Sequence, residues 1–154
     1  MQYEPLETLI VEDNPGDVRL ILEALKEGKL LVNISVVQDG IEAMDFLRRQ
    51  GKYQQAPRPD LIILDLNLPK KSGREVLAEV KTDDDLRIIP VVVLTSSEAQ
   101  DDVARAYGLH VNCYVAKPLG LDEFMRVIKS IDEFWLRTVR LPGGTKGAES
   151  RKNW

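Results

Sequence analysis

The chain has 154 residues, 44% of them hydrophobic and 30% charged, and it carries a net charge of -4. That length fits one domain with enough apolar residues for a core, and the acidic balance gives no reason to expect nucleic-acid binding. No apolar run approaches the ~18–20 residues that cross a membrane, and a single cysteine, Cys113, excludes an internal disulfide, so we expect a cytoplasmic protein without a membrane partner.

Five short apolar runs predict strands, and each is followed by a pattern typical of a helix. The predicted strands are residues 6–11, 34–37, 61–64, 88–94 and 111–116. Asn14 is expected to cap the first helix and Gly28 to end it. Capping-box patterns that start at Asp39 and Ser72 begin the second and third helices, and Ser97 is expected to cap a short fourth helix.

The last predicted helix is long and is followed by a change in composition. Its apolar residues recur at helical spacing: Leu121, Phe124, Met125, Ile128, Ile131 and Trp135. The first five of them are expected to suffice for the face that covers the sheet. Pro142 ends the regular structure, and basic residues then predominate. We therefore expect one domain over residues 1–141 and a flexible, basic C-terminal tail over residues 142–154.

The alternation of strand and helix predicts the fold class. Five repeats favour a parallel sheet with right-handed crossovers and helices on both faces. We expect an α/β, doubly wound, flavodoxin-like (βα)5 fold with one five-stranded sheet. The pattern alone does not fix the strand order, and we predict 2-1-3-4-5 because it is a common doubly wound solution.

Polar side chains stand at the carboxyl ends of four predicted strands. Glu12 and Asp13 follow the first strand, Asp65 the third and Lys117 the fifth, while Thr95 ends the fourth. These strand ends share one rim of the sheet, so we expect the side chains to meet there. Three close carboxylates repel one another, so they need a cation or a raised pKa. Mg²⁺ is suited as the cation, and a lysine and a hydroxyl can bind phosphate oxygens. The set predicts an aspartyl-phosphate site.

The strand ends resemble those of response-regulator receiver domains, over residues 6–139. The matching motifs are Val11-Glu12-Asp13-Asn14, Leu64-Asp65-Leu66-Asn67-Leu68-Pro69, Val93-Leu94-Thr95-Ser96 and Tyr114-Val115-Ala116-Lys117-Pro118. The resemblance implies a signalling protein that accepts a phosphoryl group from a sensor histidine kinase, changes conformation, and loses the group slowly by autodephosphorylation. It is not expected to be an enzyme.

The resemblance also implies roles for the site residues. Asp65 is expected to be the phosphoacceptor and Lys117 its phosphate-pairing cation. Glu12 and Asp13 are expected to bind Mg²⁺ together with Asp65 and the backbone carbonyl of Asn67. Many family members have Asp where this chain has Glu12, and the longer side chain is expected to alter the metal geometry or the lifetime of the phosphorylated state.

Two further residues are implied to carry the conformational switch. Thr95 matches the switch hydroxyl of receiver domains, and Tyr114 matches the switch aromatic. The peptide bond between Lys117 and Pro118 is similar to one that the family usually holds cis.

A narrower resemblance concerns the partner. Residues 56–60, 109–114 and 134–139 are similar to the Rcp-type response regulators that serve cyanobacterial phytochromes. The resemblance implies a phytochrome-type histidine kinase as the phosphodonor.

The end of the last helix predicts a homodimer. Phe134, Trp135 and Leu136 are consecutive, so they cannot all face one side of a helix. Apolar surface with aromatic residues at its centre is typical of an interface. The alternative is that the helix end folds back on its own domain.

Two other functions suit the same architecture. A flavodoxin-like electron carrier needs a phosphate-binding loop after the first strand, where Glu12 and Asp13 would repel a phosphate unless a cation intervenes. A hydrolase with Asp65 as nucleophile needs a second acid or base nearby in sequence, where this chain has Leu66, Asn67 and Leu68.

Overall fold

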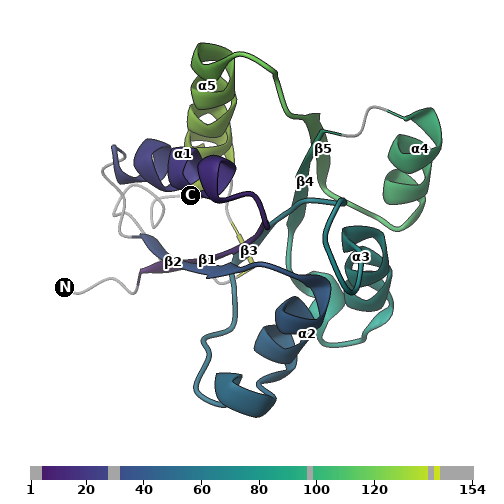
Figure 1. The fold of residues 1–154 in the computed structure, drawn as a ribbon. Coiled ribbons are helices and arrows are strands. Elements are labelled where there is room, and N and C mark those ends of the chain that lie inside the picture. The colour runs from purple at the N-terminus through teal and green to yellow at the C-terminus, as the bar shows by residue number, and fades with distance from the viewer. Residues whose placement is uncertain (1–4, 28–31, 97–98, 139–140, 143–154) are drawn as a thin grey trace.

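The computed structural model describes residues 5–27, 32–96, 99–138 and 141–142 (Figure 1). Its strands pair in parallel and form one sheet in the order β2-β1-β3-β4-β5, as predicted. The strands are β1 (Leu6–Val11), β2 (Val32–Val37), β3 (Leu61–Leu64), β4 (Val91–Thr95) and β5 (Cys113–Ala116). The predicted fold class is therefore confirmed.

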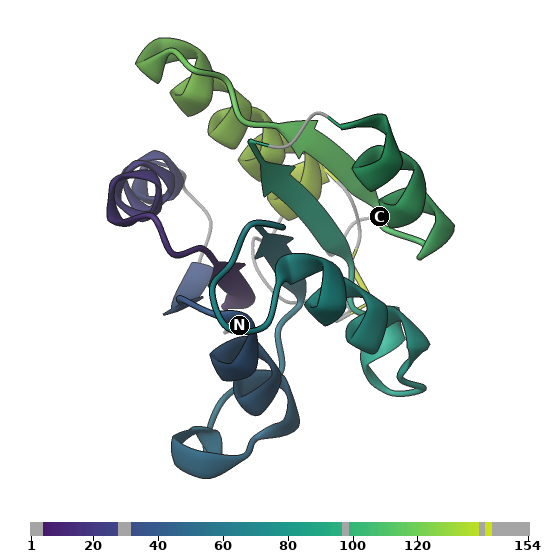
Figure 2. The same ribbon diagram turned by 45° about the vertical axis from the view of Figure 1, so that its right-hand side comes forward.

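In the described part of the chain, five α-helices cover the two faces of the sheet. They are α1 (Pro15–Lys26), α2 (Gly40–Arg48), α3 (Gly73–Thr82), α4 (Gln100–Gly108) and α5 (Leu121–Ile131). Figures 1 and 2 show α1 and α5 on one face and α2, α3 and α4 on the other. No helix in the described part of the chain is long and apolar enough to cross a membrane.

Three predicted helix caps are confirmed. The side chains of Asn14, Asp39 and Ser72 accept hydrogen bonds from the backbone N–H three residues later, at 3.1, 2.7 and 3.2 Å, which satisfies N–H groups that have no partner within the helix. Gly28 and Ser97, the predicted stop of α1 and cap of α4, lie outside the described residues. Ala99 stands at the N-cap position of α4, where no side-chain hydrogen bond is present.

The core consists of two layers, one on each face of the sheet. Strand β3 contributes Ile62 and Leu64 to the layer under α2, α3 and α4, and Leu61 and Ile63 to the layer under α1 and α5. All four are at most 2% exposed. Burial on both faces explains why this strand is a continuous apolar run without alternation.

Some predicted boundaries and core positions are wrong. Strand β4 begins at Val91 and not at residue 88, because the apolar run first forms a 3₁₀ turn, Leu86–Ile88. An apolar run does not by itself distinguish a strand from a helical turn. Leu121, a predicted core residue, is 60% exposed, since it lies in the first turn of α5.

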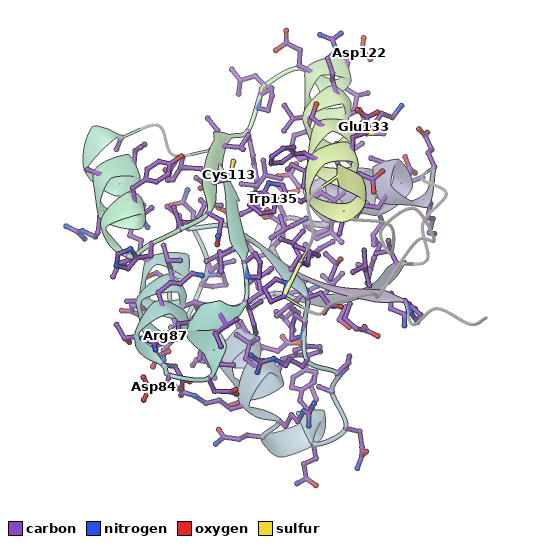
Figure 3. All side chains as sticks on the ribbon, turned by 180° about the vertical axis from the view of Figure 1, so that it is seen from behind. Asp84, Arg87, Cys113, Asp122, Glu133 and Trp135 are labelled. Atoms are coloured by element: carbon purple, nitrogen blue, oxygen red, sulfur yellow. The ribbon has the colours of Figure 1, made fainter. Side chains whose placement is uncertain are left out.

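The C-terminal end of α5 folds partly back on its own domain. Beyond Ile131 the chain continues as a π-helix, Asp132–Thr138. Leu136 is fully buried in the layer under α1 and α5, so its predicted place in a dimer interface is wrong for the chain as folded here. Phe134 is 54% exposed, and its ring packs edge to face against that of Trp135, with the two ring centroids 5.5 Å apart. Figure 3 views the molecule from behind and shows Trp135 near the C-terminal end of the last helix.

Candidate functional site

The rim at the carboxyl ends of the strands brings the predicted site residues together. The backbone N–H of Asp65 donates to the carbonyl of Val11 at 3.0 Å, and that of Lys117 donates to the carbonyl of Thr95 at 2.7 Å. These bonds continue the ladders of the sheet one step beyond the strands, so they fix where each side chain begins. Glu12, Asp65 and Thr95 are all at most 5% exposed.

Lys117 is the centre of the site. Its Nζ donates to Glu12 Oε2 at 2.6 Å, to Asp17 Oδ2 at 2.9 Å and to Asp65 Oδ2 at 3.1 Å. The lysine therefore uses its three donors on three carboxylates, one directly after β1, one on α1 and one directly after β3. The sequence analysis did not identify Asp17, in the first turn of α1, as a site residue. Its place three residues after the cap Asn14, close behind the end of β1, was the available signal.

The electrostatics of the site follow from this cluster. Burial raises the pKa of Glu12 to about 7, a rise that the hydrogen bond from Lys117 opposes and the negative charge of Asp65 reinforces. Burial is the largest single effect on the pKa of Lys117 and acts to lower it, but the hydrogen bonds to Glu12 and Asp17 and the negative charges of Glu12 and Asp65 together raise that pKa above its usual value. Lys117 is therefore cationic at neutral pH.

Three acids of the site are arranged to bind a metal ion. One carboxylate oxygen from each of Glu12, Asp13 and Asp65 lies within 4.8 Å of the others, and Asp13 is exposed to solvent. Hard oxygen ligands with room for water fit a divalent cation. Asn67 N–H donates to Asp65 Oδ1 at 3.1 Å and holds the loop in place, while its carbonyl remains a predicted ligand.

The two predicted switch residues lie in different surroundings. Thr95 is fully buried at the end of β4, and its Oγ1 accepts a hydrogen bond from Asn67 Nδ2 at 3.4 Å. Tyr114 pairs with Val93 in the sheet and packs, partly buried, against the core layer under α2, α3 and α4.

The peptide bond before Pro118 is trans, as are all peptide bonds of the described residues, so the implied cis bond is not found. Cis and trans differ by only ~0.5–1 kcal/mol before proline, so the sequence alone does not decide between them.

A glycine that the sequence did not single out fixes the approach of α3 to the site. A Cβ on Gly73 would lie 2.0 Å from the carbonyl oxygen of Asp65 and 2.6 Å from the Cα of Leu66. Gly73 N–H donates to the carbonyl of Leu66 at 3.0 Å. Only glycine permits this contact, because the obstructing atoms are backbone atoms.

We expect Gly73→Ala to destabilise the protein by about 1–3 kcal/mol, since the new methyl group forces α3 away from the Asp65 loop. Urea unfolding measures this change. Gly108→Ala is the control, because a Cβ there meets no described atom within 4 Å and should be neutral or slightly stabilising. Equal unfolding midpoints for the two variants would contradict the close-contact explanation.

The fold and the site define a class of protein. A model of the response regulator receiver domain matches residues 8–129. The chain belongs to this family, and the receiver resemblance is confirmed.

Two individual response regulators are similar to this chain over most of its length. The chain is 51% identical to response regulator Rcp1 of Synechocystis sp. over 138 residues, which cover 90% of this chain and 94% of that protein. The crystal structure of the Mn²⁺-bound form of Rcp1 superposes with a TM-score of 0.88, covering 90% of this chain and 99% of that one. The phosphorylated cyanobacterial phytochrome response regulator RcpA superposes with a TM-score of 0.87 at 52% identity, with the same two coverages. These likenesses do not favour an electron carrier.

Proposed function

We propose that this chain is a single-domain response regulator that accepts a phosphoryl group on Asp65. The observation that carries the proposal is the convergence on this carboxylate of a lysine, at 3.1 Å, and of two further acids able to hold a cation with it. Mg²⁺ is the proposed ion, held by Glu12, Asp13, Asp65 and the carbonyl of Asn67. When bound, it would neutralise charge on the phosphoryl oxygens.

The transfer is proposed to occur by direct attack. An oxygen of Asp65 attacks the phosphorus of a phosphohistidine, so that an O–P bond forms while the N–P bond breaks and its electron pair returns to the imidazole. Protonated Lys117 can then donate an N–H to a phosphoryl oxygen, and the hydroxyl of Thr95 can donate to another. Since Asp65 is only 5% exposed, water reaches the acyl phosphate with difficulty, and autodephosphorylation is proposed to be slow.

A phytochrome-type histidine kinase in the cytoplasm is the proposed phosphodonor. The support is the 52% identity to RcpA, which is a cyanobacterial phytochrome response regulator. The test is phosphotransfer from a phytochrome-type kinase and from an unrelated histidine kinase. Each kinase is first autophosphorylated with labelled ATP, and transfer to this chain is followed with and without Mg²⁺. Rapid, Mg²⁺-dependent transfer from the phytochrome kinase alone is expected. No transfer from any kinase and none from acetyl phosphate would contradict the function.

We also propose a homodimer through the exposed edge of the π-helix, now without Leu136. Phe134 and Trp135 form an aromatic pair there, and Phe134 is more than half exposed. Phe134→Asp should weaken dimerisation at least about tenfold in sedimentation experiments. Ile41→Asp is the control, since Ile41 is similarly exposed, at 50%, but lies on α2 at the opposite face. A wild type that stays monomeric with and without phosphorylation would overturn the dimer.

A further inference from the structure

Arg74, on the first turn of α3, joins two parts of the molecule. Its Nε and Nη2 bind the carboxylate of Asp102 on α4 in a bidentate pair, at 2.8 and 2.7 Å. Its Nη1 donates to the carbonyl of Leu66 at 3.3 Å, and Nη2 reaches Asn67 Oδ1 at 3.5 Å. Leu66 and Asn67 are the two residues that follow Asp65, so one guanidinium contacts both the site loop and α4.

The contact continues from the loop to the buried hydroxyl of the site. Asn67 Nδ2 donates to Thr95 Oγ1 at 3.4 Å and to Ser96 Oγ at 3.3 Å. The side-chain amide of Asn67 therefore lies between Arg74 and Thr95. The pKa of Arg74 is raised, mainly by its hydrogen bond to Asp102 and to a smaller extent by the charge of Asp65.

The described side chains of helix α4 are mostly exposed. Among residues 102–108, whose side chains the structure describes, only Ala106 is fully buried. The N-cap position of α4 carries no side-chain hydrogen bond. The side chains of Arg74 and Asp102 are 33% and 15% exposed, so their pair is partly shielded from water, and a bidentate geometry makes such a pair stronger than a single contact. Figure 2 shows α3 and α4 side by side.

We propose that Arg74 is a positioning residue that couples the loop after Asp65 to helix α4. This coupling rests on the proposed function, because the signal that Arg74 would transmit to α4 is the phosphorylation of Asp65. A phosphoryl group on Asp65 draws the Thr95 hydroxyl to one of its oxygens, and the Asn67 amide then loses one of its two acceptors and keeps only Ser96 Oγ. The acceptors of Arg74 on the loop shift, and the hold of Arg74 on Asp102 changes with them.

The experiment is amide hydrogen exchange of residues 100–108 with and without beryllofluoride and Mg²⁺, a mimic of a phosphoryl group on a carboxylate. Binding of the mimic is followed separately by ¹⁹F NMR. Without the mimic, Arg74→Met and Asp102→Asn should speed exchange in α4 about fivefold. With it, the wild type should change its α4 exchange at least about threefold, and both variants should show no change although the mimic binds them.

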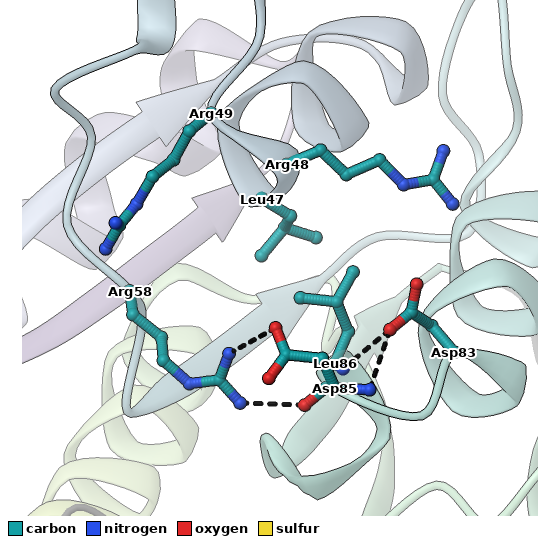
Figure 4. A pocket seen from close by; sticks show the side chains of 7 residues that line it. All are labelled: Leu47, Arg48, Arg49, Arg58, Asp83, Asp85 and Leu86. Atoms are coloured by element: carbon teal, nitrogen blue, oxygen red, sulfur yellow. Dashed lines mark hydrogen bonds and ion pairs between the residues drawn. The ribbon is translucent and has the colours of Figure 1, made fainter.

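Two more variants separate coupling from general stability. Arg74→Lys keeps the charge but not the planar fork, so it should retain the fold and lose most of the response. Arg58→Met is the matched control: Arg58 binds the side chain and the carbonyl of Asp85 at 3.0 and 2.8 Å, at the opposite end of the sheet (Figure 4). It should leave the α4 response intact. A normal response in Arg74→Met, or an unchanged α4 in mimic-bound wild type, overturns the coupling. Absence of a bound ¹⁹F signal in wild type would instead refute the proposed function, which is phosphoryl acceptance on Asp65.

Discussion

Asp65→Asn is expected to lower phosphoryl uptake by about 10³-fold or more, because an amide keeps the shape of the side chain and removes the nucleophile. The fold should survive, since the amide oxygen can still accept the N–H of Asn67. Intact-mass measurement after incubation with acetyl phosphate and Mg²⁺ gives the phosphorylated fraction directly. A circular dichroism spectrum identical to that of the wild type shows that the loss is chemical.

The control for this experiment is another aspartate. Asp84 is exposed on the turn after α3, far from the rim (Figure 3), and Asp84→Asn should be phosphorylated at the wild-type rate. If the Asp65 variant still reaches the wild-type level, another carboxylate is the acceptor. Asp13, the exposed member of the acidic cluster, is then the next residue to replace.

Lys117→Met is expected to destabilise the metal-free protein by about 3–5 kcal/mol, which is the usual cost of removing one partner from a buried ionic cluster. The Lys117 side chain is only 9% exposed, and it contacts side chains of Glu12 and Asp65 that are 3% and 6% exposed. Without the lysine, the two carboxylates face each other with no cation. Mg²⁺ should restore part of the lost stability, since it binds the folded state alone.

Urea unfolding with and without Mg²⁺ measures both effects. Lys71→Met is the matched control, because Lys71 pairs with Glu79 at 2.6 Å while their side chains are 28% and 34% exposed. Such a pair contributes at most about 1 kcal/mol. If the two lysine variants lose the same stability, burial does not make the ion pairs of Lys117 stronger than the partly exposed pair of Lys71.

The strand ends were the part of the site that the sequence could predict. Glu12, Asp65 and Lys117 each follow a buried apolar run, and the parallel topology brings such ends together whatever the details of packing. Asp17 and Arg74 were missed as site residues because both stand on helices. The direction in which a helical side chain points depends on how the helix packs on the sheet, and no local sequence pattern encodes this.

The end of the chain shows the same limit. That residues 134 to 136 could not share one face was a sound inference from helix geometry, and Leu136 is indeed buried while Phe134 is exposed. Which of them would turn inward depended on the π-helical path after Ile131, in which the number of residues per turn differs from that of an α-helix. Gly73 was likewise seen only as part of a capping box, since its contact with the Asp65 carbonyl is tertiary.

The arrangement around Lys117 also bears on the order in which the molecule assembles. The lysine lies 105, 100 and 52 positions along the chain from Glu12, Asp17 and Asp65. During synthesis the three acids leave the ribosome well before their counterion, and contacts of such long range close only after the intervening loops are ordered. A nascent chain that ends before β5 therefore has a rim of mutually repelling carboxylates, which stay hydrated, and docking of the last strand supplies the charge that lets them be buried.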